Sequence, residues 1–406
     1  MVRGRSVADQ QVADLLATAR RSLGLSVAFL SRFDGEEQRL DVVDSSVPFV
    51  FREGYTQQRQ DTFCQAILDG ELPSVIPDVT RFPRAMELPA ARLPRLRSFV
   101  SVPVTLSDGS LYGTFCAAGF TADRDLSLRD RSLMEVLAQA ASVVLEPEVA
   151  ELRRRAEVTG RLGPVVDAGG PSVVFQPVVA LADGVRVGAE ALSRFPVDWG
   201  RTPDVCFGEA HTVGLGDQLE MLALGRAAQA LATVDGYVAM NVSPGTLLAP
   251  ACQELLLGLP LDRVVLELSE HDQVADYDAL TAALAPLRAR GMRLAIDDVG
   301  AGFSSLRHIV VTAPDVIKLD RSIVAGVADD PVLATLVGSL VEFGRGCRTE
   351  LVAEGVEQER DAVMLGRLGV DYGQGWHFGR PGELRALGPG ADRRVGGLAV
   401  ARRSAA

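Results

Sequence analysis

Residues 293–320 read RLAIDDVGAGFSSLRHIVVTAPDVIKLD. An apolar run ends in two aspartates, a segment of helical character follows, and a second apolar run ends at Lys318 and Asp320. Short apolar runs that alternate with helical stretches are typical of parallel strands in a sheet covered on both faces. The stretch therefore predicts two neighbouring strands whose polar residues share one edge of the sheet.

The same alternation begins at Pro171 and continues through the second half of the chain. Seven or eight strand–helix units of this kind predict an α/β domain with a (βα)8 barrel. A doubly wound open sheet is the competing architecture. The apolar runs are VVFQPVV (173–179), VRVGAEAL (185–192), YVAMNVS (237–243), RVVLELS (263–269), RLAIDD (293–298), VIKLD (316–320) and ELVAEGV (350–356).

Six successive apolar runs carry a carboxylate, amide or ammonium group at the carboxyl end. In a barrel these ends converge on one rim, where enzymes of this fold keep their active sites. Carboxylates crowded on one rim repel each other, and a divalent cation relieves that repulsion. Oxygen ligands without His or Cys favour magnesium or manganese, and adjacent acids can serve two ions. The residues are Glu190, Asn241, Glu267, Asp297 with Asp298, Lys318 with Asp320, and Glu354.

The segment GAEALSRF (188–195) carries the Glu-Ala-Leu motif of the EAL domain family, which the second half of the chain resembles from Pro171 to Pro381. A lone tripeptide would carry no weight, but further motifs of the family follow in order. They are FQPVV (175–179), NVSP (241–244), LELSE (266–270), IDDVGAGFSSL (296–306), IKLD (317–320), AEGVE (353–357) and QGWHFGRP (374–381).

The resemblance implies hydrolysis of cyclic di-GMP to the linear dinucleotide pGpG on a (βα)8 barrel with Mg²⁺ or Mn²⁺, and we expect two ions. It also implies roles for single residues at the motif positions. The implied metal ligands are Glu190, Asn241, Glu267, Asp297 and Asp298; the implied catalytic residues are Lys318, Glu354, Asp320 and Gln374; the implied substrate-binding residues are Gln176, Leu192, Arg194, Arg380 and Pro381.

Lys318 would orient the attacking water, with Asp320 beside it, and Glu354 would help to hold the second metal or its water. Glu270 resembles the family acid that anchors the loop after Asp297-Asp298, where Gly300 and Gly302 supply backbone freedom or form an ordinary tight turn. The departures from the family pattern remove no implied metal ligand. They are Ser193, Val299, Trp376 and His377.

Residues 10–147 predict a smaller α+β domain, in which Asp108-Gly109 is a hairpin signal between two alternating stretches. We expect helices at 10–23 and 127–145 and strands at 26–33, 98–106 and 110–117. The domain also contains DTFCQAIL (61–68), LPSVIPDV (72–79) and SFVSVPVTLSDGSLYGTFCA (98–117), and on these segments it resembles a GAF sensory domain. Such folds hold cyclic nucleotides, bilins, haem or nothing, so its ligand stays open.

Two cysteines, Cys64 and Cys116, lie in the GAF-like motifs. They can attach or sense a ligand, although buried small thiols are the commoner case. All five cysteines of the chain are scattered and lack CxxC spacing, which indicates a reducing cytoplasmic setting without a disulfide framework or zinc site.

The segments that flank the barrel are a helical linker at 148–165, before a domain at 166–386, and an expected disordered tail at 387–406. The charged linker is either a solvated spacer or a signalling helix that pairs with its copy in a homodimer.

At 406 residues the chain is too long for one core, and its net charge of −12 argues against DNA as a partner. No signal peptide and no apolar run of membrane-spanning length occur, so we expect no membrane association. The leading hypothesis is a phosphodiesterase regulated by the GAF-like domain. The alternative is a catalytically silent EAL domain that serves as a cyclic di-GMP receptor or protein-interaction module.

Overall fold

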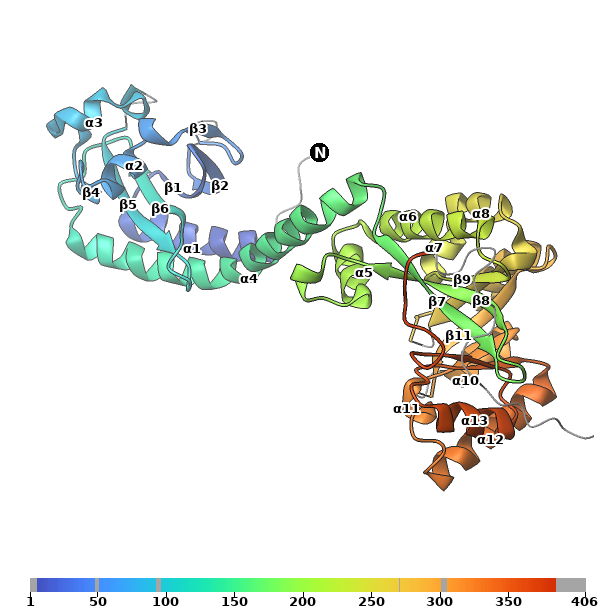
Figure 1. Cartoon of the computed structure of the whole chain (residues 1–406). Helices are drawn as coiled ribbons and strands as arrows, with labels where there is room; N and C mark the ends of the chain where they lie inside the picture. Colours follow the sequence, from blue (N-terminus) through green and yellow to red (C-terminus); the bar gives the residue numbers. More distant parts are fainter. Residues whose placement is uncertain (1–5, 48–50, 93–95, 270, 301–304, 385–406) are drawn as a thin grey trace, which may run out of the picture. The chain divides into compact units, whose positions relative to one another are not determined.

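The structure is a computed structural model that describes residues 6–47, 51–92, 96–269, 271–300 and 305–384. It divides into two compact units, Met1–Arg154 and Arg155–Ala406 (Figure 1). Each unit has its own hydrophobic core. The expected disordered tail at 387–406 lies outside the described residues.

An antiparallel sheet in the order β3-β2-β1-β6-β5-β4 forms the centre of the first unit. Side chains alternate between its two faces. Phe115 of β6 packs with α1 and α4, whereas its neighbour Cys116 packs with α2 and α3. The elements are α1 (Val7–Leu23), β1 (Val27–Asp34), β2 (Glu37–Ser45), β3 (Thr56–Gln58), α2 (Phe63–Leu68), β4 (Val75–Ile76), α3 (Pro83–Glu87), β5 (Ser98–Thr105), β6 (Leu111–Gly119) and α4 (Leu128–Asp167).

The predicted hairpin is confirmed, because β5 and β6 pair across Asp108-Gly109. Gly109 adopts φ 81°, a left-handed conformation that glycine reaches without strain, and Asp108 Oδ1 accepts a hydrogen bond from Ser110 N at 2.8 Å. The predicted first helix begins at a capping box, in which Ser6 and Asp9 bind each other's backbone N–H. The sequence did not predict β2, β3, β4, α2 or α3.

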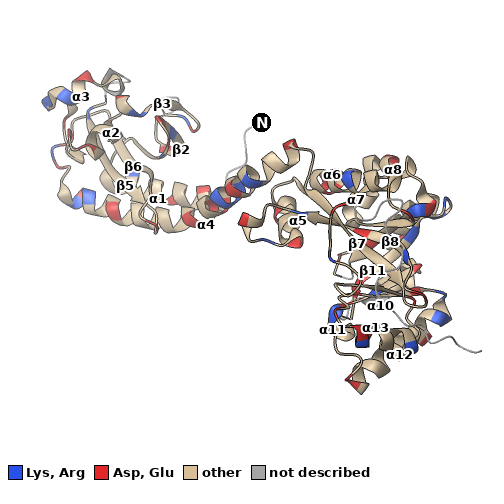
Figure 2. Cartoon of the chain, viewed as in Figure 1, with Lys and Arg blue, Asp and Glu red and all other residues tan. Residues whose placement is uncertain are grey.

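The predicted closing helix and helical linker are one continuous helix, α4, of 40 residues. Charges of both signs lie along it (Figure 2), including a Glu151–Arg154 ion pair of 2.9 Å one turn apart. The two expected helical segments are therefore continuous, with Pro147 inside α4. None of the described helices is both long and apolar enough to cross a bilayer.

A closed eight-stranded barrel forms the second unit, in the order β10-β11-β12-β13-β14-β7-β8-β9, which rules out the open sheet. One strand differs from the expectation, because β7 runs antiparallel to β8 and β14. The elements are β7 (Ser172–Ala180), β8 (Arg186–Arg194), α5 (Pro203–Thr212), α6 (Gly216–Ala228), β9 (Tyr237–Asn241), α7 (Pro244–Leu248), α8 (Pro250–Leu257), β10 (Val264–Ser269), α9 (Tyr277–Arg288), β11 (Arg293–Val299), α10 (Ser305–Thr312), β12 (Val316–Leu319), α11 (Arg321–Val324), α12 (Pro331–Cys347), β13 (Glu350–Ala353), α13 (Glu359–Leu368) and β14 (Tyr372–Gln374).

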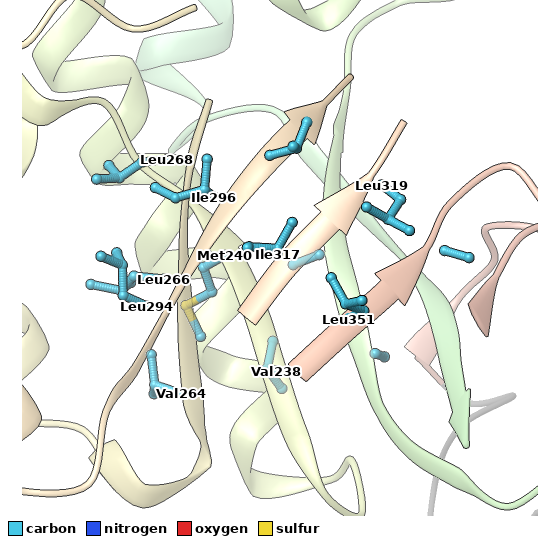
Figure 3. Close-up of a cluster of buried hydrophobic side chains, with 14 of the residues drawn as sticks. Val238, Met240, Val264, Leu266, Leu268, Leu294, Ile296, Ile317, Leu319 and Leu351 are labelled. Carbon is cyan, nitrogen blue, oxygen red and sulfur yellow. The ribbon is translucent and has the colours of Figure 1, made fainter. Parts of the chain in front are cut away.

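Alternate residues of each barrel strand face opposite sides of the wall. Val264, Leu266 and Leu268 of β10 belong to the core between strands and helices (Figure 3). Val265 belongs to a separate apolar layer inside the barrel, and Glu267 follows it two places later. The interior layer consists of Val178, Ala239, Val265, Ala295, Val316 and Val352.

Candidate active site

Polar side chains lie above the interior apolar layer because the strands alternate with a period of two. The residue two places after a layer residue is Asn241 on β9, Glu267 on β10, Asp297 on β11 and Lys318 on β12. Glu354 follows β13 in the same way. The predicted convergence of these residues on one rim is therefore found in the barrel.

Lys318 lies at the centre of four carboxylates. Its Nζ is 2.7 Å from Glu354, 3.1 Å from Glu267, 3.1 Å from Asp297 and 3.4 Å from Glu190. Burial opposes the charged ammonium, but the four carboxylates outweigh it and raise the pKa of Lys318 well above its usual value. The side chain is only 2% exposed, so this charge is held inside the protein.

The chain contains no other lysine, since every remaining basic side chain of the Lys/Arg class is an arginine. A lysine ammonium is a compact charge on a flexible stem, whereas the planar guanidinium of arginine needs room for five donors. A compact cation suits a position that four carboxylates enclose.

One ammonium does not neutralise these acids. Burial, followed by repulsion from Glu190, raises the pKa of Glu267 well above its usual value. Burial and repulsion from Asp297 do the same to the pKa of Glu354 and raise that of Asp298 to about 6. The site therefore lacks positive charge, and a divalent cation with oxygen ligands fits that deficit.

Two groups of carboxylates have oxygens close enough to share an ion, and within each group these atoms lie within 4.8 Å of one another. Asp297 belongs to both groups. Asn241 Nδ2 lies 3.2 Å from Glu190 and 3.3 Å from Glu267, so the amide stands beside the first group. The groups are Glu190 with Glu267 and Asp297, and Asp297 with Asp298 and Glu354.

A local distortion of β11 lets two consecutive aspartates reach one site. Neighbouring residues of a regular strand point to opposite faces. Asp298 instead adopts φ 60°, which is uncommon for residues other than glycine, and its N–H donates to Asp297 Oδ1 at 2.9 Å. The pairing of β11 with β12 shifts register between Ile296 and Val299, where the distortion lies.

Two glutamines connect β7 and β14 to this cluster. Gln374 Nε2 donates to Glu190 at 2.5 Å and to Gln176 Oε1 at 3.2 Å. Gln176 pairs with Glu190 in the β7–β8 ladder and donates to Gly379 O at 3.0 Å. Both glutamines therefore hold Glu190 in place.

Two cavities open beside the carboxylates. The first, of about 280 Å³, lies against α5 and includes Leu192, Arg194 and Phe207 in its lining. The second, of about 290 Å³, is lined by Gln176, Leu192 and the carboxylates of Glu190, Asp297 and Glu354. Leu192 lines both, so the cavities adjoin at the Glu-Ala-Leu motif. We call them the α5 cavity and the carboxylate cavity.

In the described part of the chain, the predicted site residues Asp320, Arg380 and Pro381 neither pair with Lys318 nor line the two cavities. Asp320 caps α11 by accepting from Ser322 N at 2.8 Å, and the carboxylates that pair with Lys318 among the described residues do not include it. Its expected place beside the lysine therefore stays a prediction. Arg380 and Pro381 are absent from the described lining of both cavities. Glu270 and Gly302 lie outside the described residues.

The sequence missed three residues that line the carboxylate cavity: Arg321, Glu357 and Trp376, the last noted only as a departure. Arg321 Nη2 pairs with Glu357 at 3.0 Å, and the Arg380 guanidinium lies 4.4 Å from the centre of the Trp376 ring. Their signal was position, since each lies a few residues after the end of β12, β13 or β14.

Comparison with known proteins agrees with both units. The EAL domain matches residues 162–381, and the GAF domain matches residues 9–146. Probable cyclic di-GMP phosphodiesterase PdeD of Escherichia coli is 35% identical over 154 residues, which is 37% of this chain and 29% of PdeD. Cyclic di-GMP phosphodiesterase RocR of Pseudomonas aeruginosa is 30% identical over 255 residues, 58% of this chain and 62% of RocR. The chain thus spans less than two thirds of these relatives.

Solved structures of EAL proteins share the fold. The PaMucR phosphodiesterase, solved as a c-di-GMP complex, is 29% identical, with a TM-score of 0.50 over 57% of this chain and 99% of that one. The EAL enzyme Bd1971, in its cAMP- and cyclic-di-GMP-bound form, is 19% identical with a TM-score of 0.53 over 89% and 92%, and supports the fold alone. Since the family match at residues 162–381 covers more than half of the chain, and the closed barrel with its carboxylate rim occupies the same residues, the protein belongs to the EAL domain family.

Proposed function

We propose that the barrel hydrolyses cyclic di-GMP to the linear dinucleotide pGpG. The position of Lys318 among four carboxylates carries the proposal. Burying these charges costs free energy, and apolar side chains of similar size in the same place would not incur that cost. A catalytic role therefore explains the cluster better than a contribution to the stability of the fold. The substrate comes from the relatives, which are named as cyclic di-GMP phosphodiesterases.

The cofactors that we propose are two Mg²⁺ or Mn²⁺ ions. The two carboxylate groups that share Asp297, and the shortage of positive charge around Lys318, support this proposal. Bound ions would polarise the scissile phosphate and supply a hydroxide at neutral pH. The residues that would hold them are Glu190, Asn241, Glu267, Asp297, Asp298 and Glu354.

The reaction consumes one water. Water attacks phosphorus, one bond from phosphorus to a 3′ oxygen breaks, and that oxygen takes up a proton. Lys318 would orient the water and offset the charge that develops on phosphate. Gln374 would keep Glu190 at its ligand position through the 2.5 Å hydrogen bond. Asp320 would act indirectly, by capping α11 next to Lys318.

The dinucleotide would lie across the α5 cavity and the carboxylate cavity. Arg194 lines the α5 cavity, where its guanidinium can offer two parallel donors to a phosphate or a guanine edge. Gln176 and Leu192 line the carboxylate cavity. We place Arg380 and Pro381 at its entrance, since Arg380 stacks on Trp376.

We also propose that the GAF-like domain (10–147) regulates the barrel domain (166–386) through the linker (148–165). The second half of α4 packs within the barrel unit, where Leu162 is fully buried in a cluster with Ala210 and Leu219. Arg161 pairs with Glu209 of α5, and Phe207 of the same helix lines the α5 cavity. A displacement of this half of α4 would move the cavity wall.

We propose that the protein forms a homodimer. Val136 and Val143 of α4 are 67% and 62% exposed and lie seven residues apart. Apolar residues at this spacing form the seam of paired helices, and burying them against a second copy is favourable. The GAF-like domain binds an unassigned ligand or none.

A product assay tests the proposed hydrolysis. Purified full-length protein is incubated with cyclic di-GMP and Mg²⁺ or Mn²⁺, and the nucleotides are resolved by chromatography. We expect pGpG from the wild type and from the exposed-surface control Glu254→Ala, and none from Glu190→Ala. Binding of cyclic di-GMP without turnover by the wild type would overturn the proposal and leave the receptor alternative.

A further inference from the structure

Two thiols meet inside the first unit. Cys64 of α2 and Cys116 of β6 are 52 residues apart in the chain, but their Sγ atoms are only 3.4 Å apart. Both side chains are buried, at 2% and 0% exposure, on the sheet face that α2 and α3 cover. The sequence had left these cysteines as scattered single thiols, because no spacing rule relates a short helix to the central strand of a sheet.

The surroundings of the pair are polar for a protein core. Cys116 Sγ lies 3.2 Å from Ser101 Oγ and 3.2 Å from Thr114 Oγ1. Thr114 in turn contacts Ser31 at 2.8 Å. Buried hydroxyls keep their place only where they find hydrogen-bond partners, and here they surround a sulfur. These contacts keep Cys116 as a hydrogen-bonded thiol beside Cys64, with its S–H donated to Thr114 Oγ1.

The two thiols differ in acidity. Hydrogen bonds from Cys116, Thr114, Gln38 and Ser101 outweigh burial and lower the pKa of Cys64 to about 7. Burial and the neighbouring Cys64 raise the pKa of Cys116 well above its usual value. In such a pair the thiolate is the sulfur that an oxidant attacks. The neighbouring thiol can then condense with the resulting sulfenic acid to form a disulfide.

We propose that Cys64 and Cys116 are an oxidisable dithiol and a site of modification by small hydroperoxides. The Cys64 thiolate attacks one peroxide oxygen, the O–O bond breaks, and the departing oxygen leaves as water after protonation. Cys116 then attacks the Cys64 sulfenic acid, the S–S bond forms, and a second water leaves. Two thiols are oxidised, and one hydrogen peroxide is reduced to two waters.

The pair needs little rearrangement to react. A disulfide has sulfurs about 2.05 Å apart, so the 3.4 Å separation must close by about 1.4 Å. Cys64 lies on α2, a helix of only six residues. A small shift of this helix can bring its sulfur to that of Cys116 on β6. Burial of both sulfurs restricts the oxidant to molecules close to water in size. The bond would tie α2 to β6, the strand that precedes α4.

Mass spectrometry of the full chain tests this site without any assay of turnover. Reduced protein is treated with hydrogen peroxide, quenched, unfolded and alkylated, and then weighed and digested without reductant. We expect a mass equal to that of the reduced chain plus three alkyl groups and minus about 2 Da, with three of the five cysteines alkylated and one linked peptide pair that contains Cys64 and Cys116. Dithiothreitol should restore all five thiols.

Variants separate this pair from the other cysteines. Cys64→Ser and Cys116→Ser should each abolish the 2 Da loss, whereas Cys252→Ser, at another buried cysteine, should retain it. Five alkylated cysteines after peroxide treatment would overturn the proposal, as would oxygen addition without a link or a link through the exposed Cys347. Because the wild-type peptide map decides among these outcomes, the conclusion stands even where a serine variant fails to fold.

Discussion

At the scale of single residues, strand alternation decides which side chains meet. Val265 and Glu267, like Ala295 and Asp297, are separated by two places and therefore face the same interior. The exception is Asp298, whose φ of 60° turns a second carboxylate toward the site. The period of two is visible in the sequence, but the backbone distortion that adds Asp298 is not.

The single lysine gives a direct probe of metal binding. Lysine labelled with ¹³C at Cε should produce one side-chain NMR signal, from Lys318, and Mn²⁺ bound to the surrounding carboxylates should broaden it. Asp297→Asn removes the carboxylate common to both groups, so broadening should require at least tenfold more Mn²⁺. Glu254→Gln should behave as the wild type. A signal that stays sharp with excess Mn²⁺ would exclude the proposed ion site.

The acidity of Cys64 predicts how its oxidation depends on pH. Only the thiolate reacts with peroxide, so the rate should rise as pH increases, reach half its maximum near the Cys64 pKa of about 7, and then level off. Stopped-flow measurement of the rate of thiol loss between about pH 5.5 and 9 covers the range in which such a thiol titrates. Cys116→Ala removes the largest stabilising hydrogen bond and should move the midpoint upward. A midpoint unchanged in that variant would argue against the pair.

At the scale of elements, α4 and β7 depart most from the sequence-based expectation. The closing helix and the linker were expected as separate segments, yet α4 runs through both; its buried apolar residues lie between Met134 and Leu145 and again at Val158 and Leu162. β7 has the apolar character of a parallel strand, because it too is buried on both faces. Strand direction is set by how the barrel closes, which a local pattern does not encode.

Leu162 tests the contact between α4 and the barrel unit. Leu162→Ala removes a fully buried side chain and should lower the free energy of unfolding of that unit by about 3 kcal/mol. Leu152→Ala, on the same helix but 48% exposed, should change it by less than about 0.5 kcal/mol. Urea denaturation followed by circular dichroism measures both. Equal effects of the two variants would mean that this half of α4 does not pack as described.

At the scale of the whole molecule, the two units were predictable because the spacing of apolar residues along the sequence differs between them. The sequence indicated a barrel from buried alternating units and an α+β domain from the Asp108-Gly109 hairpin. The meeting of Cys64 with Cys116 was not predictable, because it depends on how α2 folds back over the sheet. Local patterns thus locate the carboxylate rim, whereas contacts between distant segments require the fold.

Dimerisation is a property of the whole chain. Val136→Asp with Val143→Asp places two charges on the exposed face of α4 and should convert a dimer to a monomer without unfolding the protein. Light scattering coupled to size-exclusion chromatography gives the mass. Val197→Asp, at a position 96% exposed, is the matched control and should remain dimeric. A wild-type mass of one chain, 43.2 kDa, would contradict the proposed dimer.

The hydrolysis of cyclic di-GMP is tested most directly in a single turnover with ¹⁸O-labelled water. Enzyme in excess over substrate, with Mg²⁺ or Mn²⁺, should convert all of the cyclic di-GMP to pGpG that carries one ¹⁸O atom on its new terminal phosphate. Glu190→Ala should leave the substrate intact. Cyclic di-GMP recovered unchanged from the wild-type protein, or pGpG formed without the label, would contradict water attack at the carboxylate rim.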